Sequence, residues 1–135
     1  MKCVMIIDEE LPIGLIANTA AVLALSIGEK IPGIIGEDVH DQEGAIHPGI
    51  TQIPIPLLKG NKASLRSLRQ AVLKAASPDL YYVDFCDAAQ KSRTYTEYKE
   101  ALQRIAPERL SYLGIAICGP NKLVNNLTGS IGLLR

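Results

Sequence analysis

The stretch KCVMIIDEELPIGLIANTAAVLALSIG, Lys2 to Gly28, joins two patterns that decide the fold. Its first part, Lys2 to Ile7, is a short apolar run rich in branched residues, which is typical of a strand buried on both faces of a sheet. Its second part, Leu11 to Gly28, has no charged side chain. Pro12 suits a first helical turn, and Gly28 suits the position just past a helix end. A central strand followed by a helix predicts an α/β fold.

The charge-free segment also has to be compared with a signal peptide and a membrane anchor. A signal peptide carries positive charge ahead of its apolar core, whereas Asp8, Glu9 and Glu10 precede this one. A membrane helix needs about 20 apolar residues. This segment is shorter and contains five residues that interrupt it: Pro12, Gly14, Asn18, Thr19 and Ser26. We therefore expect no membrane span. We expect a buried helix covered on more than one side, with packing deep in the domain favoured over a dimer interface.

Length, charge and cysteine content narrow the class of protein. The chain has 135 residues, 47% of them hydrophobic, so we expect a single domain over residues 1–135. The 14 basic and 14 acidic side chains cancel, which gives no overall electrostatic case for nucleic acid or a lipid surface. Cys3, Cys86 and Cys118 lie far apart in apolar runs. They predict reduced core thiols in a cytoplasmic protein rather than a disulfide framework or a zinc site.

The remainder of the chain alternates between strand and helix patterns. Pro54 and Pro56 lack backbone donors, so the second strand belongs at a sheet edge. The polar, aperiodic segment Glu29–Gly49 contains DQEG (Asp41–Gly44), which is typical of a hairpin tip or a loop. The expected strands are Ile50–Leu58, Asp79–Cys86 and Tyr112–Cys118, and the expected helices are Lys62–Ala76, Thr94–Ile105 and Pro120–Thr128.

The polar segment also gathers side chains of the types that bind metal ions. Their spacing matches no metal motif, so we expect a solvated loop, no metal and no cofactor. These side chains are Glu37, Asp38, His40, Asp41, Glu43 and His47.

Cys86 and Asp87 end the third predicted strand, at the edge where open α/β sheets bind their ligands. A cysteine nucleophile needs an activating base, and nothing in the sequence brings a histidine to Cys86, which favours a buried thiol. Asp87 is either a turn or cap residue or a carboxylate of the site.

A basic stripe marks the helix predicted at Lys62–Ala76 and the residues before it. Such a row can hold phosphates along a nucleic-acid backbone with an affinity that falls with salt, although a solvated face is the favoured interpretation. The stripe consists of Lys59, Lys62, Arg66 and Arg69.

Two further stretches combine with Lys2–Gly28 into a recognisable pattern. They are DQEGAIHPGITQIPIPLLKG (Asp41–Gly60) and LGIAICGPNKLVNNLTGSIGLLR (Leu113–Arg135). Together they resemble the uncharacterised bacterial family called domain of unknown function two thousand, which is similar to type II peptidyl-tRNA hydrolase. The resemblance to this uncharacterised family covers essentially the whole chain. The similarity to the hydrolases is confined to the two ends of the chain. This resemblance implies a single α/β domain, in which a small four-stranded mixed sheet is flanked by helices on both faces. It also implies that the domain forms homodimers.

The resemblance does not carry over the hydrolase chemistry. In the hydrolases the first helix carries a catalytic lysine and, one turn on, a glutamine. Ala17 and Ala21 stand at those positions here, while Gly14 keeps a glycine. Asp87 matches an aspartate that follows the third strand in the hydrolases, and Thr94 matches a later threonine. Alanine neither activates a water nor stabilises an oxyanion, so the ancestral ester cleavage is expected to be lost.

Three functional hypotheses remain. The leading one is a cytoplasmic domain that binds an unidentified small ligand in a polar cleft lined by Asn18, Thr19 and Asp87, with Gly14 and Thr94 as further ligand-binding candidates. A second is a hydrolase of peptidyl or aminoacyl esters, with Asp87 as base or orienting group and Asn18 as donor, so the sequence leaves open whether the chain is an enzyme. A third is a dimeric interaction module whose basic stripe contacts tRNA or another RNA. Asn18 either satisfies a nearby backbone group or contacts the ligand.

Overall fold

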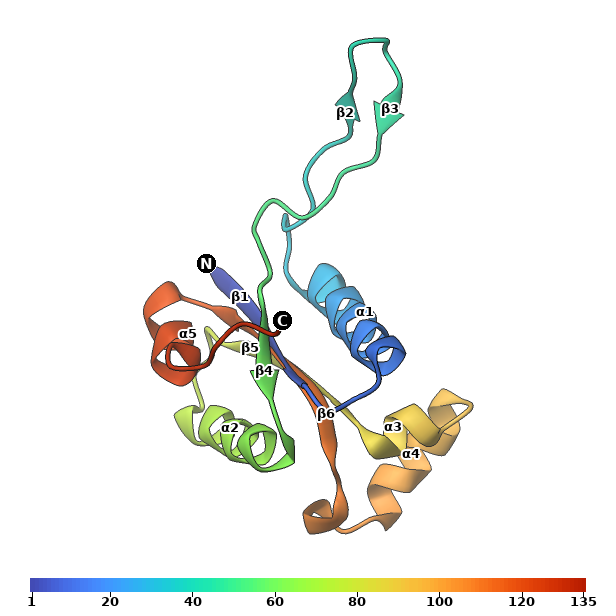
Figure 1. Ribbon diagram of the computed structural model, residues 1–135, viewed down its shortest axis with the longest axis vertical. Helices are drawn as coiled ribbons and strands as arrows, with labels where there is room; N and C mark the ends of the chain where they lie inside the picture. The colour runs from blue at the N-terminus through green and yellow to red at the C-terminus, as the bar shows by residue number, and fades with distance from the viewer.

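β1 (Lys2–Asp8) lies inside the sheet of the computed structural model, which describes residues 1–135 (Figure 1). Its parallel neighbour is β4 (Leu57–Gly60), and its antiparallel neighbour is β6 (Tyr112–Gly119). β6 also pairs antiparallel with β5 (Tyr81–Cys86). The strand order β4-β1-β6-β5 makes a four-stranded mixed sheet, so the predicted α/β architecture is confirmed.

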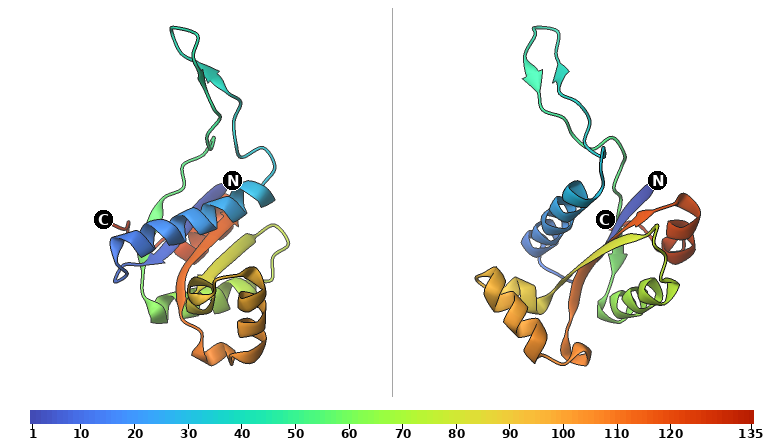
Figure 2. Two further views of the ribbon diagram at one scale, coloured as in Figure 1. Left: turned by 90° about the vertical axis from the view of Figure 1, so that its right-hand side faces the viewer. Right: turned by 180° about the vertical axis from the view of Figure 1, so that it is seen from behind.

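Helices cover both faces of this sheet (Figure 2). α1 (Ile13–Lys30) lies on one face, and α2 (Lys62–Ala75) and α5 (Asn121–Thr128) share the other. The connection from β5 to β6 contains the remaining helical segments, which are α3 (Asp87–Lys91), α4 (Tyr95–Arg104) and a 3-10 turn (Pro107–Arg109). α3 was not expected from the sequence.

The side chains of β1 alternate between two cores, because successive residues of a strand face opposite sides of a sheet. Met5 and Ile7 belong to the core beneath α1, whereas Val4 and Ile6 belong to the core beneath α2. All four side chains are at most 3% exposed. This double burial explains why the strand forms an unbroken apolar run in the sequence.

α1 differs from the sequence prediction at its end and in its burial. It continues through Gly28 to Lys30, so Gly28 is an interior residue and not a cap. Only Thr19, Leu23 and Ile27 are buried, and Leu25 is 77% exposed. The expectation that this helix packs deep in the domain is therefore wrong, and its outer face is uncovered. α1 also has the length and hydropathy of a membrane span, a test that single core helices pass as well.

The cysteines correct a second expectation. β1 and β6 pair in a register that sets Cys3 directly opposite Cys118, and the structure joins the two sulfurs in a disulfide. The expectation of three reduced thiols is therefore wrong for this pair, whose members are 115 residues apart in sequence. Cys86 is the free cysteine and is buried, as expected.

The two edges of the sheet are treated differently. β4 is an edge strand, as predicted, but it begins only at Leu57, after the two prolines. The carboxyl-terminal tail covers this edge, with the Lys59 N–H donating to the Gly132 carbonyl at 2.9 Å and the Leu134 N–H to the Leu57 carbonyl at 2.9 Å. The opposite edge, β5, has no such cover.

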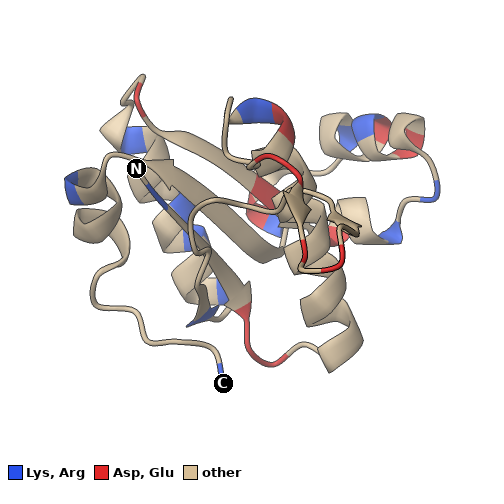
Figure 3. Ribbon diagram, turned by 90° about the horizontal axis from the view of Figure 1, so that it is seen from above, with Lys and Arg blue, Asp and Glu red and all other residues tan.

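A two-stranded arm, residues 31–56, packs on the core beneath α1 at its base, where Ile34 is buried, and beyond this base projects away from the sheet and its helices (Figure 1). β2 (Val39–His40) and β3 (Ile46–His47) pair antiparallel near its tip, so the predicted turn at DQEG is confirmed as the end of a hairpin. The arm carries four acids and no lysine or arginine. Figure 3 shows these acidic segments along the arm. Exposed apolar side chains are spaced along it: Ile35, Val39, Ile46 and Ile50.

Candidate ligand pocket at the open sheet edge

The outer edge of β5 presents backbone groups without partners. In an antiparallel pair, alternate residues direct their N–H and C=O groups toward the neighbouring strand and the others direct them outward. β6 satisfies the inward groups of Tyr81–Cys86. None of the backbone hydrogen bonds outside the helices and strands involves a residue of β5. The outward groups of β5 are therefore free to bind another molecule.

A pocket of about 400 Å³ opens at this edge. β5 forms its floor through Val83, Asp84 and Phe85, while α1 supplies one wall and the segment from α3 into α4 the other. The walls combine apolar and hydroxyl-bearing side chains, and those used below are Val22, Ser26, Thr94, Tyr95 and Tyr98. A pocket of this size, mostly apolar with a few polar groups, is typical of a small-ligand site.

The aromatic wall is partly fixed by packing. The rings of Tyr95 and Tyr98 meet edge to face with centroids 5.6 Å apart, which is a favourable aromatic geometry. Burial raises the pKa of Tyr98. It also raises the pKa of Tyr81, against the opposing effect of a hydrogen bond with Ser26. Both phenols are therefore neutral hydrogen-bonding groups at physiological pH.

The charges around the pocket differ in how they are paired. Asp84 accepts a hydrogen bond from Nε of Arg69 at 2.9 Å, on the face of the sheet that α2 covers. The guanidinium of Arg69 also lies 5.2 Å from the ring centroid of Tyr112. Arg93 lines the pocket, is exposed and forms no ion pair in the structure. The lining therefore includes one positive charge, that of Arg93, without an ion-pair partner.

The predicted polar cleft does not coincide with this pocket, because Asn18, Thr19 and Asp87 are absent from its lining and Thr94 is the one ligand-binding candidate that lines it. Asn18 is exposed on α1, and Gly14 faces open space. Thr19 is fully buried, with its hydroxyl donating to the Leu15 carbonyl at 2.7 Å. Thr94 caps α4 by accepting a hydrogen bond from the Glu97 N–H.

Asp87 acts as a structural connector between α3 and the start of β6. Its Oδ1 accepts hydrogen bonds from the N–H groups of Ala88 at 2.9 Å and Ser111 at 3.1 Å. Its own N–H donates to the Ser111 carbonyl. Asp87 is the first residue of α3 and Cys86 is the N-cap, so these contacts lie at the turn from β5 into the helix and are not a helix cap.

Replacing Asp87 tests whether its oxygen or its charge matters. Asp87→Asn keeps an acceptor oxygen and should change the free energy of unfolding by less than about 1 kcal/mol, whereas Asp87→Ala should lower it by about 1–2 kcal/mol. Urea unfolding monitored by circular dichroism measures both. Equal losses in the two variants would contradict the role assigned to the oxygen.

The basic stripe is largely occupied by contacts within the chain. Arg66 donates to the carbonyls of Pro107, Glu108 and Leu110. Arg69 binds Asp84. Lys62 is exposed at the start of α2. Of the three basic-stripe side chains on α2, Arg66 and Arg69 thus hold α2 against the elements around β6.

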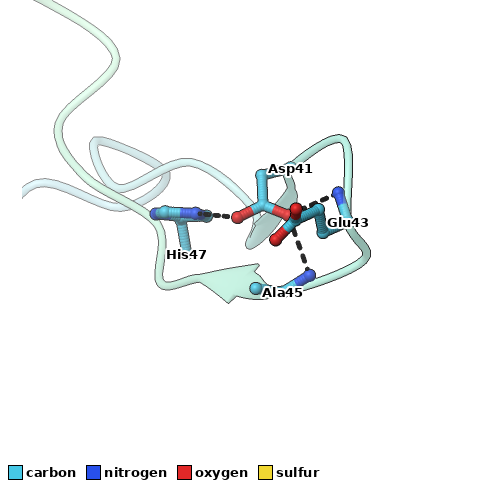
Figure 4. A network of polar contacts seen from close by, with 4 residues as sticks. All are labelled: Asp41, Glu43, Ala45 and His47. Carbon is cyan, nitrogen blue, oxygen red and sulfur yellow. Dashed lines mark hydrogen bonds and ion pairs between the residues drawn. The ribbon is translucent and has the colours of Figure 1, made fainter.

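Neither the free cysteine nor the histidines form a reactive centre. Burial is the main cause that raises the pKa of the Cys86 thiol, so the reactive thiolate is disfavoured. Both histidines lie on the arm, where His47 is 2.9 Å from Asp41 Oδ2 (Figure 4). The hydrogen bond with His47 lowers the pKa of Asp41, and the hydrogen bonds that Asp41 accepts from the N–H groups of Ala45 and Glu43 lower it further. No three histidine, cysteine or acidic side chains come together as a metal site.

These features define a small α/β domain with one closed and one open sheet edge, a pocket at the open edge and a projecting arm. Over residues 1–135 the chain belongs to the family described as "Protein of unknown function (DUF2000)". Its structure is similar to that of the protein of unknown function Atu0240 from Agrobacterium tumefaciens str. C58, at 20% sequence identity and a TM-score of 0.85. That match covers 98% of this chain and 96% of the other. The chain has no significant match among curated proteins.

The pocket was missed in the sequence because its walls come from three separate segments. The aromatic wall left one signal, since Tyr95 and Tyr98 are three residues apart and share one face of a helix. The unpaired edge of β5 left no signal in the sequence, because an edge strand and an inner strand can have the same residue pattern.

Proposed function

We propose that this protein is a ligand-binding domain whose site is the pocket at the open edge of β5. The observation that carries the proposal is the pocket itself, about 400 Å³ in volume and floored by a strand with free backbone groups. The hydroxyl groups of Ser26, Thr94 and Tyr98 orient a ligand, and Phe85 and Val22 supply apolar contact. This site replaces the cleft of Asn18, Thr19 and Asp87 expected from the sequence.

A variant that fills the pocket tests the proposal. Ser26→Phe places a ring in the cavity, whereas Gln103→Phe adds the same ring to the exposed part of α4 outside the pocket lining. The probe is a library of small-molecule fragments screened against ¹⁵N-labelled protein by NMR. We expect hits that shift the amides of Val83–Phe85 and Ser92–Tyr98. Ser26→Phe should weaken the binding of these fragments about tenfold or more, because its ring occupies the cavity; each tenfold is about 1.4 kcal/mol of binding free energy. Gln103→Phe should leave their binding unchanged. Fragments that bind elsewhere, or that bind both variants equally, would contradict the proposal.

Loss of the ancestral hydrolase activity is the second part of the proposal. Ala17 and Ala21 occupy the positions where the resemblance places a lysine and a glutamine, and both are exposed on α1. We expect N-acetylphenylalanyl-tRNA to be cleaved by the protein no faster than in buffer, because neither side chain activates water. Release of labelled N-acetylphenylalanine measures this. Turnover that Asp87→Asn abolishes would favour the hydrolase hypothesis instead.

We also propose that the chain forms a homodimer through the outer face of α1. This face has no charged side chain between Ile13 and Gly28 and exposes two large apolar side chains, Ile13 and Leu25, to water in a monomer. The arm supplies a reason for the partner to be a second copy. The arm contains four acidic residues and no lysine or arginine, so its net charge is −4. The net charge of the whole chain is 0, so the remainder of the chain has a net charge of +4. The arm of one copy is therefore attracted to the body of another.

A further inference from the structure

The open edge of β5 has a counterpart within the same molecule that shows how it can be filled. On the far side of the sheet, Gly132–Leu134 runs along β4 as an extended segment and exchanges backbone hydrogen bonds with Leu57 and Lys59. The sheet is thus extended there by a short peptide of the chain itself. No segment of the chain does the same for β5.

From Tyr81 to Phe85 the edge also lacks the devices that keep other strands away. Exposed edge strands are protected by proline, by lysine, by bulges or by a covering element. Tyr81–Cys86 contains no proline and no lysine. Its register with β6 is regular until the shift between Phe85 and Cys86. The charge of Asp84 is directed to Arg69 on the α2 side and so does not guard the edge.

The walls of the pocket flank the edge of β5 on both sides. α1 and α4 stand on either side of the β5 floor, with Val22 and Ser26 from one wall and Tyr95 and Tyr98 from the other. Side chains of an added strand alternate between its two faces. One set would therefore meet the α1 wall and the other the aromatic wall, while its backbone bonds to β5.

The charge of Arg93 selects the chemistry of the segment. Arg93 is the one charged side chain of the lining that forms no ion pair, since Asp84 is neutralised by Arg69. The neighbouring carboxylate of Glu97 accepts the backbone N–H of Arg93 and does not line the pocket. A guanidinium binds a carboxylate through charge-assisted hydrogen bonds.

We propose that the pocket binds an extended peptide that adds a strand to β5, with a free carboxylate near Arg93. This inference rests on the proposed function, because it names the class of ligand for the same pocket. Backbone hydrogen bonds would give the affinity, and the two walls would select alternate side chains.

Two peptide pools test this proposal directly. Both contain N-acetylated hexapeptides of random sequence, one ending in a free carboxylate and the other in an amide. We expect binding from the free-carboxylate pool and about tenfold slower hydrogen exchange of amides within Val83–Phe85 when a selected peptide is bound. Arg93→Gln should weaken a selected peptide about tenfold, whereas Arg104→Gln, an exposed arginine of α4 outside the lining, should not.

A second design separates strand addition from ordinary pocket binding. The selected peptide is remade with N-methyl groups on its odd residues in one version and on its even residues in another. Only alternate amides of an added strand face the edge. One version should therefore lose binding and the other should keep it. Equal effects of the two versions would overturn strand addition.

The remaining outcomes distinguish this inference from the proposals on which it stands. If fragments bind the pocket and no peptide does, the peptide inference fails and the ligand-binding proposal stands. If neither binds, both fail. If the amides of β5 are already protected in concentrated protein without peptide, and the protection is lost on dilution to monomer, a second copy occupies the edge and the peptide inference is wrong.

Discussion

The variant Gly114→Val is expected to lose about 3 kcal/mol or more of unfolding free energy, because its side chain has no room in the centre of the sheet. A Cβ at this position would lie 2.7 Å from Cγ2 of Thr19 and 3.2 Å from the carbonyl oxygen of Ile6. Thr19 is fully buried beneath α1, so α1 would have to move away from β6 to admit the side chain. A domain of this size has about 5–15 kcal/mol to lose in total. Urea unfolding of the variant and wild type measures the difference.

A second glycine provides the matched control. Gly28 lies inside α1, and a Cβ added there meets nothing within 4 Å. Gly28→Ala should therefore be neutral or stabilising by up to about 1 kcal/mol, since alanine favours helix more than glycine does. If Gly114→Val unfolds at the same urea concentration as wild type, the close packing of α1 on β6 is wrong.

The sequence predicted the inner strands of this domain well because burial on both faces leaves a clear pattern. Lys2–Ile7 and Tyr112–Cys118 are unbroken apolar runs and form the two inner strands, β1 and β6. α2 begins and ends within one residue of its predicted bounds, since its apolar face follows the period of a helix. The resemblance added the mixed sheet, which no local pattern specifies.

The predictions that failed depend on contacts between distant residues. The disulfide joins Cys3 and Cys118, which are neighbours only through the β1–β6 register. The apolar character of α1 predicted burial, yet only one side of the helix contacts the sheet. Composition measures how apolar a segment is and not what covers it. The arm was predicted only at its tip, because the turn residues are local and the extended sides are not.

The same logic explains why the candidate site was only partly anticipated. Asp87 was correctly placed at the end of β5, but its oxygen bonds the backbone at Ser111, 24 residues away. Arg93 and Ser26 become neighbours of one pocket only once α1, β5 and α4 are folded together. Local patterns identify polar residues near strand ends, whereas the fold decides which of them share a cavity.

The second prediction concerns the dimer. Leu25→Asp should dissociate it, with a dissociation constant at least about 100-fold higher than that of wild type. Leu25 is 77% exposed in the single chain, so the substitution removes no contact within the fold. In a symmetric dimer it occurs twice, and each buried leucine contributes about 1.5–3 kcal/mol. A loss of 3–6 kcal/mol corresponds to about 100-fold or more at 1.4 kcal/mol per tenfold. Sedimentation velocity over a range of concentrations measures it.

Leu73→Asp is the control, because Leu73 is an exposed leucine, at 45%, on α2, which covers the opposite face of the sheet. It should leave the dimer intact, and circular dichroism should show both variants folded. The dependence of dimerisation on salt adds a second criterion. Attraction between the arm, with a net charge of −4, and the remainder of the chain, with a net charge of +4, weakens as ionic strength rises. Apolar contact between two α1 helices does not weaken with ionic strength. Wild type that sediments as a monomer at every concentration contradicts the proposal. If that monomer floats with phosphatidylcholine vesicles and Leu25→Asp does not, the uncovered face of α1 binds lipid rather than a second copy.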